Sequence, residues 1–171
     1  MLGVSSEVAV VMSDDTTDQS VTPIRRLVLP PVVLLAALAL QGALDRWWPL
    51  AVWFSMPWKM LGWAPIVLGC VFCALGAKLF RRHRTTIRPF YTSDALVTTG
   101  VYGLSRNPMY LGMTLVLVGV AVIGGSVSVW IVPPLFVAAI QRRFIRAEEA
   151  MLSERFGEQY DRYRRGVRRW I

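Results

Sequence analysis

The chain has 171 residues, 54% of them hydrophobic and 18% charged, and carries a formal net charge of +8 at pH 7. With a mean hydropathy of +0.45, it is too apolar for an ordinary soluble domain, and several membrane spans are expected. The net charge alone would also fit a nucleic-acid-binding protein, but the positions of the basic residues argue against that class.

The N-terminal segment is predicted to be a tail that covers residues 1–22. Its first twenty residues include Glu7, Asp14, Asp15 and Asp18 but no Lys or Arg, whereas a secretory signal peptide begins with basic residues. We therefore expect a disordered tail, followed by one membrane domain at residues 23–171.

Four apolar runs follow, and each is close to the roughly 20 residues that cross a bilayer. They are Leu27–Leu44, Met60–Phe80, Tyr110–Gly124 and Val127–Ile140. The last two are short, and Gly124, Gly125 and Ser126 between them predict a tight turn and hence a helical hairpin. The expected fold is all-α, a multi-pass integral membrane protein with about four transmembrane helices.

The basic residues predict the topology. With a cytoplasmic N-terminus, the inner side receives Arg25, Arg26, six residues from Lys78 to Arg106 and nine from Arg142 to Arg169. Only Arg46 and Lys59 fall outside. The positive-inside rule expects this asymmetry of four spans with both termini in the cytoplasm, as in a protein of the plasma (inner) membrane. The tryptophan-rich stretch Asp45–Trp58 is then an interfacial loop on the outer face.

Two features could suggest metal or redox chemistry. Cys70 and Cys73 form a CxxC motif, but they lie in the middle of an expected span, and the chain has no other cysteine. Spaced three residues apart, they share one helix face, where buried cysteine behaves as a small hydrophobe. His83 is the only histidine and lies in a basic run expected to meet lipid headgroups. A histidine-rich metal site is therefore excluded, and no metal is predicted.

The stretch Leu96–Met113, LVTTGVYGLSRNPMYLGM, places polar residues where a membrane helix begins. Gly100 and Gly103 permit unusual backbone angles, and Pro108 suits the first turn of the third span. Taken alone, the stretch fits a well-capped loop whose arginine contacts lipid phosphate.

A second polar stretch follows the fourth span. Apolar residues recur there at steps of three and four and predict an amphipathic C-terminal helix on the cytosolic side: Ile145, Leu152, Phe156, Tyr160, Tyr163, Val167 and Trp170. Glu148 and Glu149 do not fit a helix that only binds an anionic membrane, because such a surface repels them. They need a bound cation or suitably spaced arginines, which are present at Arg142, Arg143 and Arg146.

A tight hairpin between the third and fourth spans would bring both polar stretches together on the cytoplasmic side. The predicted pocket contains an arginine, an asparagine, two tyrosines and two glutamates beside the membrane. Such a pocket suits a ligand that carries both charge signs and an apolar neighbour.

The motifs LVTTGVYGLSRNPMYLG and RAEEAMLSERFGEQYDRY together resemble the isoprenylcysteine carboxyl methyltransferase and phospholipid N-methyltransferase superfamily of integral membrane methyltransferases. The likeness covers roughly Ala95–Trp170, which would be the cofactor-binding part. It implies that S-adenosylmethionine binds on the cytosolic side, that its ammonium group meets Glu148, and that a lipidic acceptor enters from the bilayer. The implied cofactor-binding residues are Leu96, Val97, Tyr102, Arg106, Asn107, Tyr110, Glu148 and Glu149. By charge, Arg106 suits the methionine carboxylate.

Departures from the superfamily pattern concern the acceptor. The carboxyl methyltransferases usually have a histidine where Asn107 stands and often another at Ala95, and asparagine cannot titrate near neutrality. They also have an arginine where Phe144 stands. Arg143 and Arg146 flank this position and are the candidate acceptor-binding residues. A carboxylate is the favoured acceptor, although oxygen, nitrogen and sulfur all stay open as the acceptor atom. No catalytic residue is assigned.

Two other functions stay open. Membrane reductases of sterols and related lipids share a similar arginine-proline-tyrosine motif and would bind NADPH, but NADPH has no positive group comparable to the one that two glutamates would bind. A non-catalytic protein whose basic helix binds anionic lipid is the other candidate, and it predicts that Glu148 is dispensable for ligand binding. The expected partners are thus the bilayer and a lipidic or small hydrophobic acceptor, with no nucleic acid.

Overall fold

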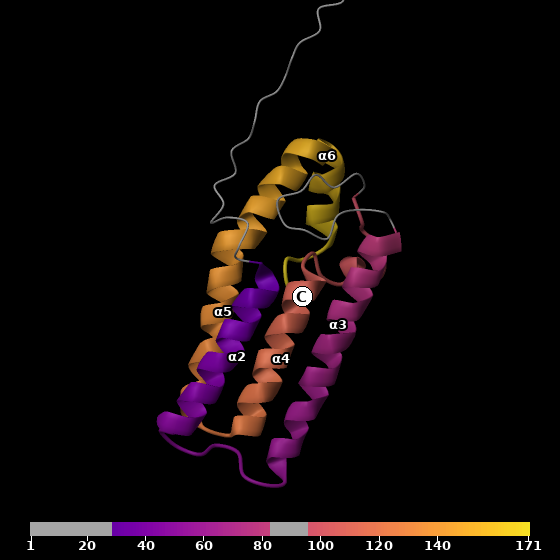
Figure 1. The fold of residues 1–171 in the computed structure, drawn as a ribbon. Coiled ribbons are helices and arrows are strands. Elements are labelled where there is room, and N and C mark those ends of the chain that lie inside the picture. Colours follow the sequence, from indigo (N-terminus) through magenta and orange to yellow (C-terminus); the bar gives the residue numbers. More distant parts are fainter. Residues whose placement is uncertain (1–28, 83–95) are drawn as a thin grey trace, which may run out of the picture.

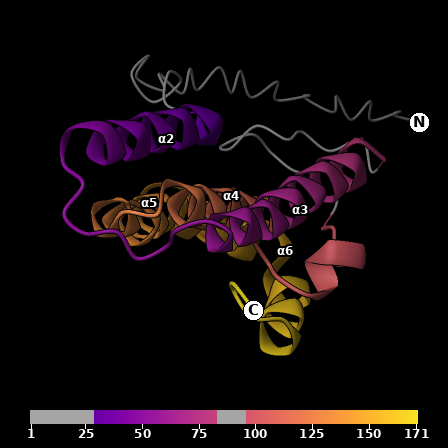
Figure 2. The ribbon, with the colours of Figure 1, turned by 90° about the horizontal axis from the view of Figure 1, so that it is seen from below.

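The computed structural model describes residues 29–82 and 96–171. The predicted tail at 1–22, His83 and Ala95 lie outside the described residues. Within them the chain is helical apart from loops and one isolated antiparallel bridge. Four helices lie side by side in alternating directions: α2 (Pro30–Trp47), α3 (Trp63–Arg82), α4 (Pro108–Gly124) and α5 (Val132–Ile140) (Figure 1). In a view along the bundle, α2 lies on one side of α4 and α5, and the C-terminal helix α6 (Arg146–Gly166) lies on the other (Figure 2).

Glycines allow α3 and α4 to approach very closely, and this is the most extensive helix contact in the described part of the chain. A Cβ at Gly62, the residue directly before α3, would lie 2.5 Å from the carbonyl oxygen of Gly119. One at Gly112 would lie 2.5 Å from the carbonyl oxygen of Gly69. Small residues at facing positions let membrane helices pack backbone to backbone, so these glycines fix where the start of α4 stands relative to α3.

A buried amide connects α2 to α4. The side chain of Gln41 is 1% exposed, and its Nε2 donates a hydrogen bond to the carbonyl oxygen of Leu117 at 2.9 Å. A polar side chain in an apolar bundle is costly unless it is bonded. This bond therefore holds α2 in register with α4.

The predicted tight turn after the third run is confirmed. Gly125 ends α4 in the left-handed conformation, with φ 83°, which glycine adopts without a Cβ penalty. The tryptophan-rich loop packs on this turn, because Trp53 N donates to Gly125 O at 2.7 Å and Val127 N donates to Ala51 O at 2.8 Å. Trp47, Trp48, Trp53 and Trp58 in and around the loop are all more than 60% exposed.

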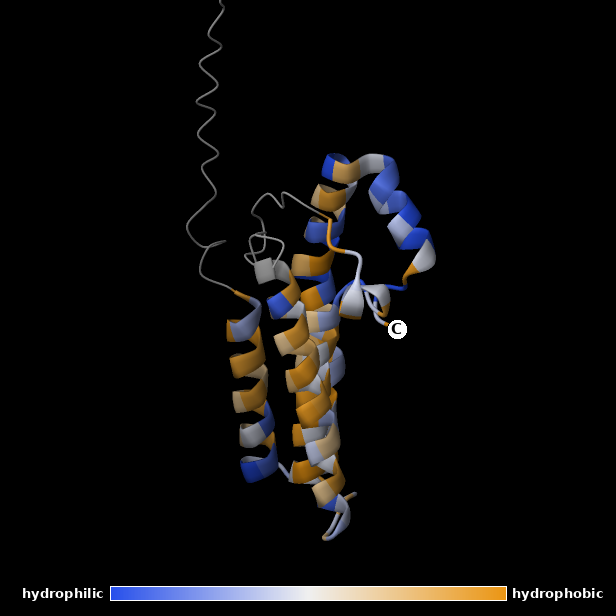
Figure 3. Cartoon of the chain, turned by 90° about the vertical axis from the view of Figure 1, so that its right-hand side faces the viewer, coloured by the Kyte–Doolittle hydropathy of each residue, from blue (hydrophilic) through white to orange (hydrophobic). Residues whose placement is uncertain are grey.

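Two of the described helical stretches, Trp58–Leu79 and Val127–Gly166, are long and apolar enough to cross a membrane by length and composition, and Pro108–Gly124 is a shorter apolar helix. The first combines the 3₁₀ helix η1 (Trp58–Gly62) with most of α3. The second joins a 3₁₀ helix η3 (Val127–Ile131), α5, a π-helical segment η4 (Gln141–Ile145) and α6. Figure 3 shows apolar residues along the bundle and polar residues over most of α6.

The C-terminal helix differs from the single amphipathic helix predicted to reach Trp170. α6 ends at Gly166, and inside it Gly157 has φ 46° and ψ −123°, which breaks the helical path. The chain folds back there, so its C-terminus lies beside the start of α4 (Figure 1). The periodic prediction fails because helical spacing continues on both sides of a glycine that can adopt an angle open to few other residues.

Candidate functional site

The polar residues of the two predicted stretches meet at one end of the bundle, as the hairpin predicts. Pro108 begins α4 directly after Asn107, and the first turn of α4 carries Tyr110. The Tyr110 hydroxyl donates a hydrogen bond to Glu148 Oε1 on α6 at 2.6 Å. A short bond between a hydroxyl and a carboxylate is among the stronger hydrogen bonds in proteins, so it fixes the Glu148 side chain against the start of α4.

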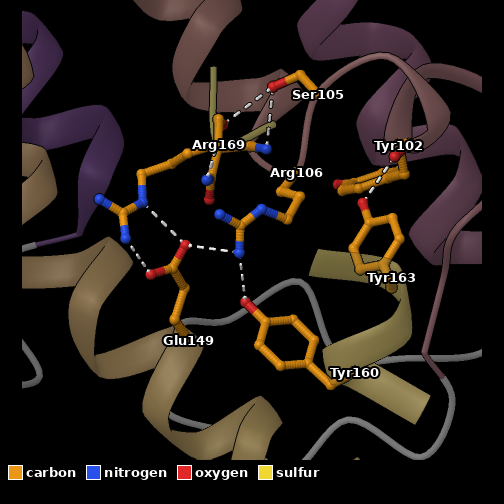
Figure 4. Close-up of polar contacts among 8 residues, drawn as sticks. Tyr102, Ser105, Arg106, Glu149, Tyr160, Tyr163 and Arg169 are labelled. Carbon is orange, nitrogen blue, oxygen red and sulfur yellow. Dashed lines mark hydrogen bonds and ion pairs between the residues drawn. The ribbon is translucent and has the colours of Figure 1, made fainter. Parts of the chain in front are cut away.

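Glu149 is held by two arginines (Figure 4). Its Oε1 lies 3.1 Å from Arg106 Nη1. Arg169 donates to both of its carboxylate oxygens, from Nε at 2.9 Å and from Nη2 at 2.7 Å. The hydrogen bond that Arg169 donates to Glu149 raises the pKa of Arg169, and the negative charge of the carboxylate adds to this effect. Arg106 Nη1 also donates to the Tyr160 hydroxyl at 3.2 Å, so three segments distant in sequence are tied together.

The segment Leu96–Tyr102 contacts both α3 and α6. Val97, Val101 and Tyr102 are buried and pack against Phe72 and Leu79 of α3. The Tyr163 hydroxyl of α6 donates to the Tyr102 carbonyl oxygen at 2.6 Å (Figure 4). Burial raises the pKa of Tyr102, and the nearby Tyr163 and Glu148 add to that effect. Tyr102 therefore carries a neutral hydroxyl at physiological pH. Leu96, at the start of the segment, is only partly buried.

Asn107 is buried and bonds to the C-terminal segment. Its Nδ2 donates to the Arg169 carbonyl oxygen at 3.1 Å, and its backbone N–H donates to Ser105 Oγ at 3.1 Å. Asn107, which stands where the carboxyl methyltransferases usually have a histidine, therefore contacts the C-terminal segment at Arg169.

The predicted local partners for Glu149 are wrong. Arg142, Arg143 and Arg146 are exposed, and Glu149 pairs instead with Arg106 and Arg169. In the π-helical segment Gln141–Ile145, Phe144 and Ile145 are buried, whereas Arg142 and Arg143 are exposed. The residues that sequence reasoning missed are Ser105, Tyr160, Tyr163 and Arg169. Tyr160 and Tyr163 stood out in the sequence as apolar positions of the C-terminal helix. Their hydroxyl groups were the available signal that they could form hydrogen bonds in the site.

Two groups in the site suit a ligand with both charge signs. Glu148 has no cationic partner among residues 29–82 and 96–171, although it lies next to a glutamate that has two. Arg106 Nε is buried and has no hydrogen-bond partner within the same ranges. A half-buried charge and a buried donor are each costly without a partner. The α-ammonium and α-carboxylate of an amino acid would supply both partners, so these two residues fit the amino-acid part of S-adenosylmethionine.

Comparison with known proteins places the chain in a family. The phospholipid methyltransferase family model matches residues 58–159. This range covers more than half of the chain, and the chain therefore belongs to the phospholipid methyltransferase family, a family of membrane methyltransferases. The predicted membership of the isoprenylcysteine and phospholipid methyltransferase superfamily is confirmed.

Among curated proteins, the chain is 35% identical over 63 residues to an uncharacterized protein of Haemophilus influenzae, covering 37% of this chain and 100% of that protein. It is 30% identical over 141 residues to the nickel-cobalt-cadmium resistance protein NccN of Alcaligenes xylosoxydans xylosoxydans, covering 81% of this chain and 58% of NccN.

A solved structure shares the fold. The eukaryotic intramembrane Ras methyltransferase ICMT, an isoprenylcysteine carboxyl methyltransferase, superposes with a TM-score of 0.60 at 20% identity, covering 91% of this chain and 57% of that one. The chain thus spans somewhat more than half the length of both ICMT and NccN. At this identity the likeness concerns the fold.

Proposed function

We propose that the chain is an S-adenosylmethionine-dependent methyltransferase that acts on a lipidic or membrane-partitioned acceptor. The observation that carries the proposal is that the two adjacent glutamates have different partners. Glu149 forms ion pairs with two arginines, whereas the partner of Glu148 among the described residues is a tyrosine hydroxyl. Glu148 is therefore the anionic group left to receive the ammonium group of the cofactor.

The other predicted site residues have distinct roles in the proposal. Arg106 Nε would meet the cofactor carboxylate, and Tyr102 and Tyr110 would line the pocket with neutral rings that can also attract a sulfonium. Leu96 and Val97 would offer backbone contacts. Glu149 would support the site indirectly, because it holds Arg106 in place.

Methyl transfer depends mainly on how the methyl donor and the acceptor are positioned relative to each other. When bound, S-adenosylmethionine supplies a methyl group on a sulfonium, which a nucleophilic acceptor atom can displace directly. The protein then contributes by holding its two ligands in line, and positioning of this kind supplies much of the acceleration of such reactions. The described residues contain no group of three or more metal-ligating side chains, and the proposal includes no metal.

We also propose the membrane arrangement. α2, α3, α4 and the stretch from η3 to α5 would be four spans, with residues 23–171 as one domain, both termini cytoplasmic and the site facing the cytoplasm of a plasma (inner) membrane. α4 has 17 residues, which makes it about 26 Å long. Local thinning of the bilayer accommodates such a small mismatch.

The acceptor proposal favours a carboxylate, as in isoprenylcysteine carboxyl methyltransferases, with Arg143 and Arg146 as its candidate contacts. Both arginines are exposed and lie just beyond the apolar part of the fourth proposed span. From there they can reach an anionic group at the headgroup level.

The proposal is tested by methyl transfer in isolated membranes. Membranes containing the protein are incubated with S-adenosylmethionine labelled in the methyl group, with membranes containing Glu148→Gln as the control. We expect label in the lipid-extractable fraction of the wild type only. Mild alkali then identifies the acceptor, because a methyl ester releases volatile methanol, whereas N-methyl and S-methyl products keep the label. Equal labelling by both proteins would contradict the proposed role of Glu148.

A further inference from the structure

The last residues of the chain bind the loop that carries the candidate cofactor residues. Val167 leaves α6 in an extended conformation. The Arg168 carbonyl oxygen accepts a hydrogen bond from Arg106 N at 3.0 Å. The Arg169 carbonyl oxygen accepts from Ser105 Oγ at 3.3 Å and from Asn107 Nδ2 at 3.1 Å. Three consecutive loop residues are thus held by two consecutive carbonyl groups.

Side chains of the same segment complete the attachment. The Arg169 guanidinium grips Glu149 with two parallel hydrogen bonds, a planar geometry that a lysine does not reproduce. Trp170 packs against the apolar cluster that contains Tyr110 and Phe144. Figure 4 shows the Arg169 guanidinium against the Glu149 carboxylate, and the adjacent Glu148 accepts the hydrogen bond from Tyr110.

We propose that Val167–Trp170 form a C-terminal clamp that holds the Ser105–Asn107 loop in place, with Arg169 as its positioning residue. The benefit of the clamp for cofactor binding rests on the proposed function. By neutralising Glu149 together with Arg106, Arg169 leaves Glu148 as the carboxylate that receives a cationic ligand group. By fixing Asn107 and the Arg106 backbone, the clamp sets the position of the loop on which Arg106 stands.

The fold-back at Gly157 gives the clamp its reach. α6 first leads away from the bundle and then returns, so that residues distant from the loop in sequence arrive beside it (Figure 1). Without the return, the three loop-to-tail hydrogen bonds and the Arg169 contact with Glu149 would not form.

Two measurements on the detergent-purified protein test the clamp. Hydrogen–deuterium exchange without ligand reports on peptides covering the loop, and calorimetric titration with S-adenosylhomocysteine reports on the site. The variants are Arg169→Ala, Arg169→Lys and Arg165→Ala, the last a matched control because Arg165 is an exposed arginine of α6. Unchanged exchange in α3 and α4 shows that each variant is folded.

We expect Arg169→Ala to raise exchange in the loop and to weaken S-adenosylhomocysteine binding by at least about tenfold. Arg169→Lys should recover part of the loss, because the charge stays but the two-pronged grip does not. Arg165→Ala should stay within about twofold of the wild type. Unchanged loop exchange in Arg169→Ala would refute the clamp, whatever the ligand result.

The two proposals fail separately. Wild-type protein that binds no S-adenosylhomocysteine contradicts the proposed function, while faster loop exchange in Arg169→Ala still supports the clamp. Faster exchange combined with unchanged affinity in Arg169→Ala refutes its link to cofactor binding and leaves the proposed function intact.

Discussion

Replacing Glu149 by glutamine tests whether this residue stabilises the fold while its neighbour serves a ligand. The substitution keeps the size of the side chain but removes the charge that faces Arg106 and Arg169. Removing one partner of a fully buried ion pair costs about 3–5 kcal/mol, and exposed pairs contribute about 0–1 kcal/mol. The side chains here are 16% (Glu149), 10% (Arg106) and 36% (Arg169) exposed, so we expect a loss of about 2 kcal/mol.

For a chain of this size, that loss corresponds to a decrease in Tm of about 4–8 °C. The assay is ligand-free thermal unfolding in detergent, followed by tryptophan fluorescence. Glu154→Gln is the matched control, because Glu154 is an exposed glutamate on the same helix. Glu148→Gln should unfold at or above the wild-type temperature, because it removes a carboxylate without a cationic partner among the described residues. A Glu149→Gln protein as stable as Glu154→Gln would refute this assignment of roles.

Three further substitutions test the packing around the site by the same unfolding assay. Gly69→Ala should cost about 1–3 kcal/mol, because the added Cβ would press on a backbone carbonyl of α4, whereas Gly42→Ala, with nothing within 4 Å, should cost nothing; equal effects would contradict the close packing. Gly157→Ala should cost about 1–3 kcal/mol through backbone strain at φ 46°, and a wild-type Tm would argue against the fold-back. Tyr163→Phe should cost about 1–3 kcal/mol, because it removes the donor to the Tyr102 carbonyl oxygen, and an unchanged Tm would refute that bond.

Much of the bundle could be predicted because its signals are local. Apolar runs of membrane length mark the helices, Pro108 marks the start of α4, and Gly125 marks its end. The meeting of Tyr110 and Glu148 also follows from the sequence, because a tight turn must bring the start of one helix next to the end of its partner.

The rest of the site could not be predicted because its signals are spatial. Helical spacing continues through Gly157, so the pattern alone hides the fold-back. Once the chain returns, Arg169 reaches Glu149 from twenty residues away, and arginines one turn away are not needed. A search for cationic partners restricted to neighbouring helical positions could therefore find only Arg142, Arg143 and Arg146, which the structure leaves exposed.

The most direct test of the proposed function is calorimetric titration of the purified protein with S-adenosylhomocysteine, with NADPH as the control ligand. The account predicts that the wild type binds S-adenosylhomocysteine and not NADPH. Glu148→Gln should weaken that binding by at least tenfold, about 1.4 kcal/mol, while its Tm stays at or above that of the wild type. Binding of NADPH instead, or equal S-adenosylhomocysteine affinity in both proteins, would contradict the account.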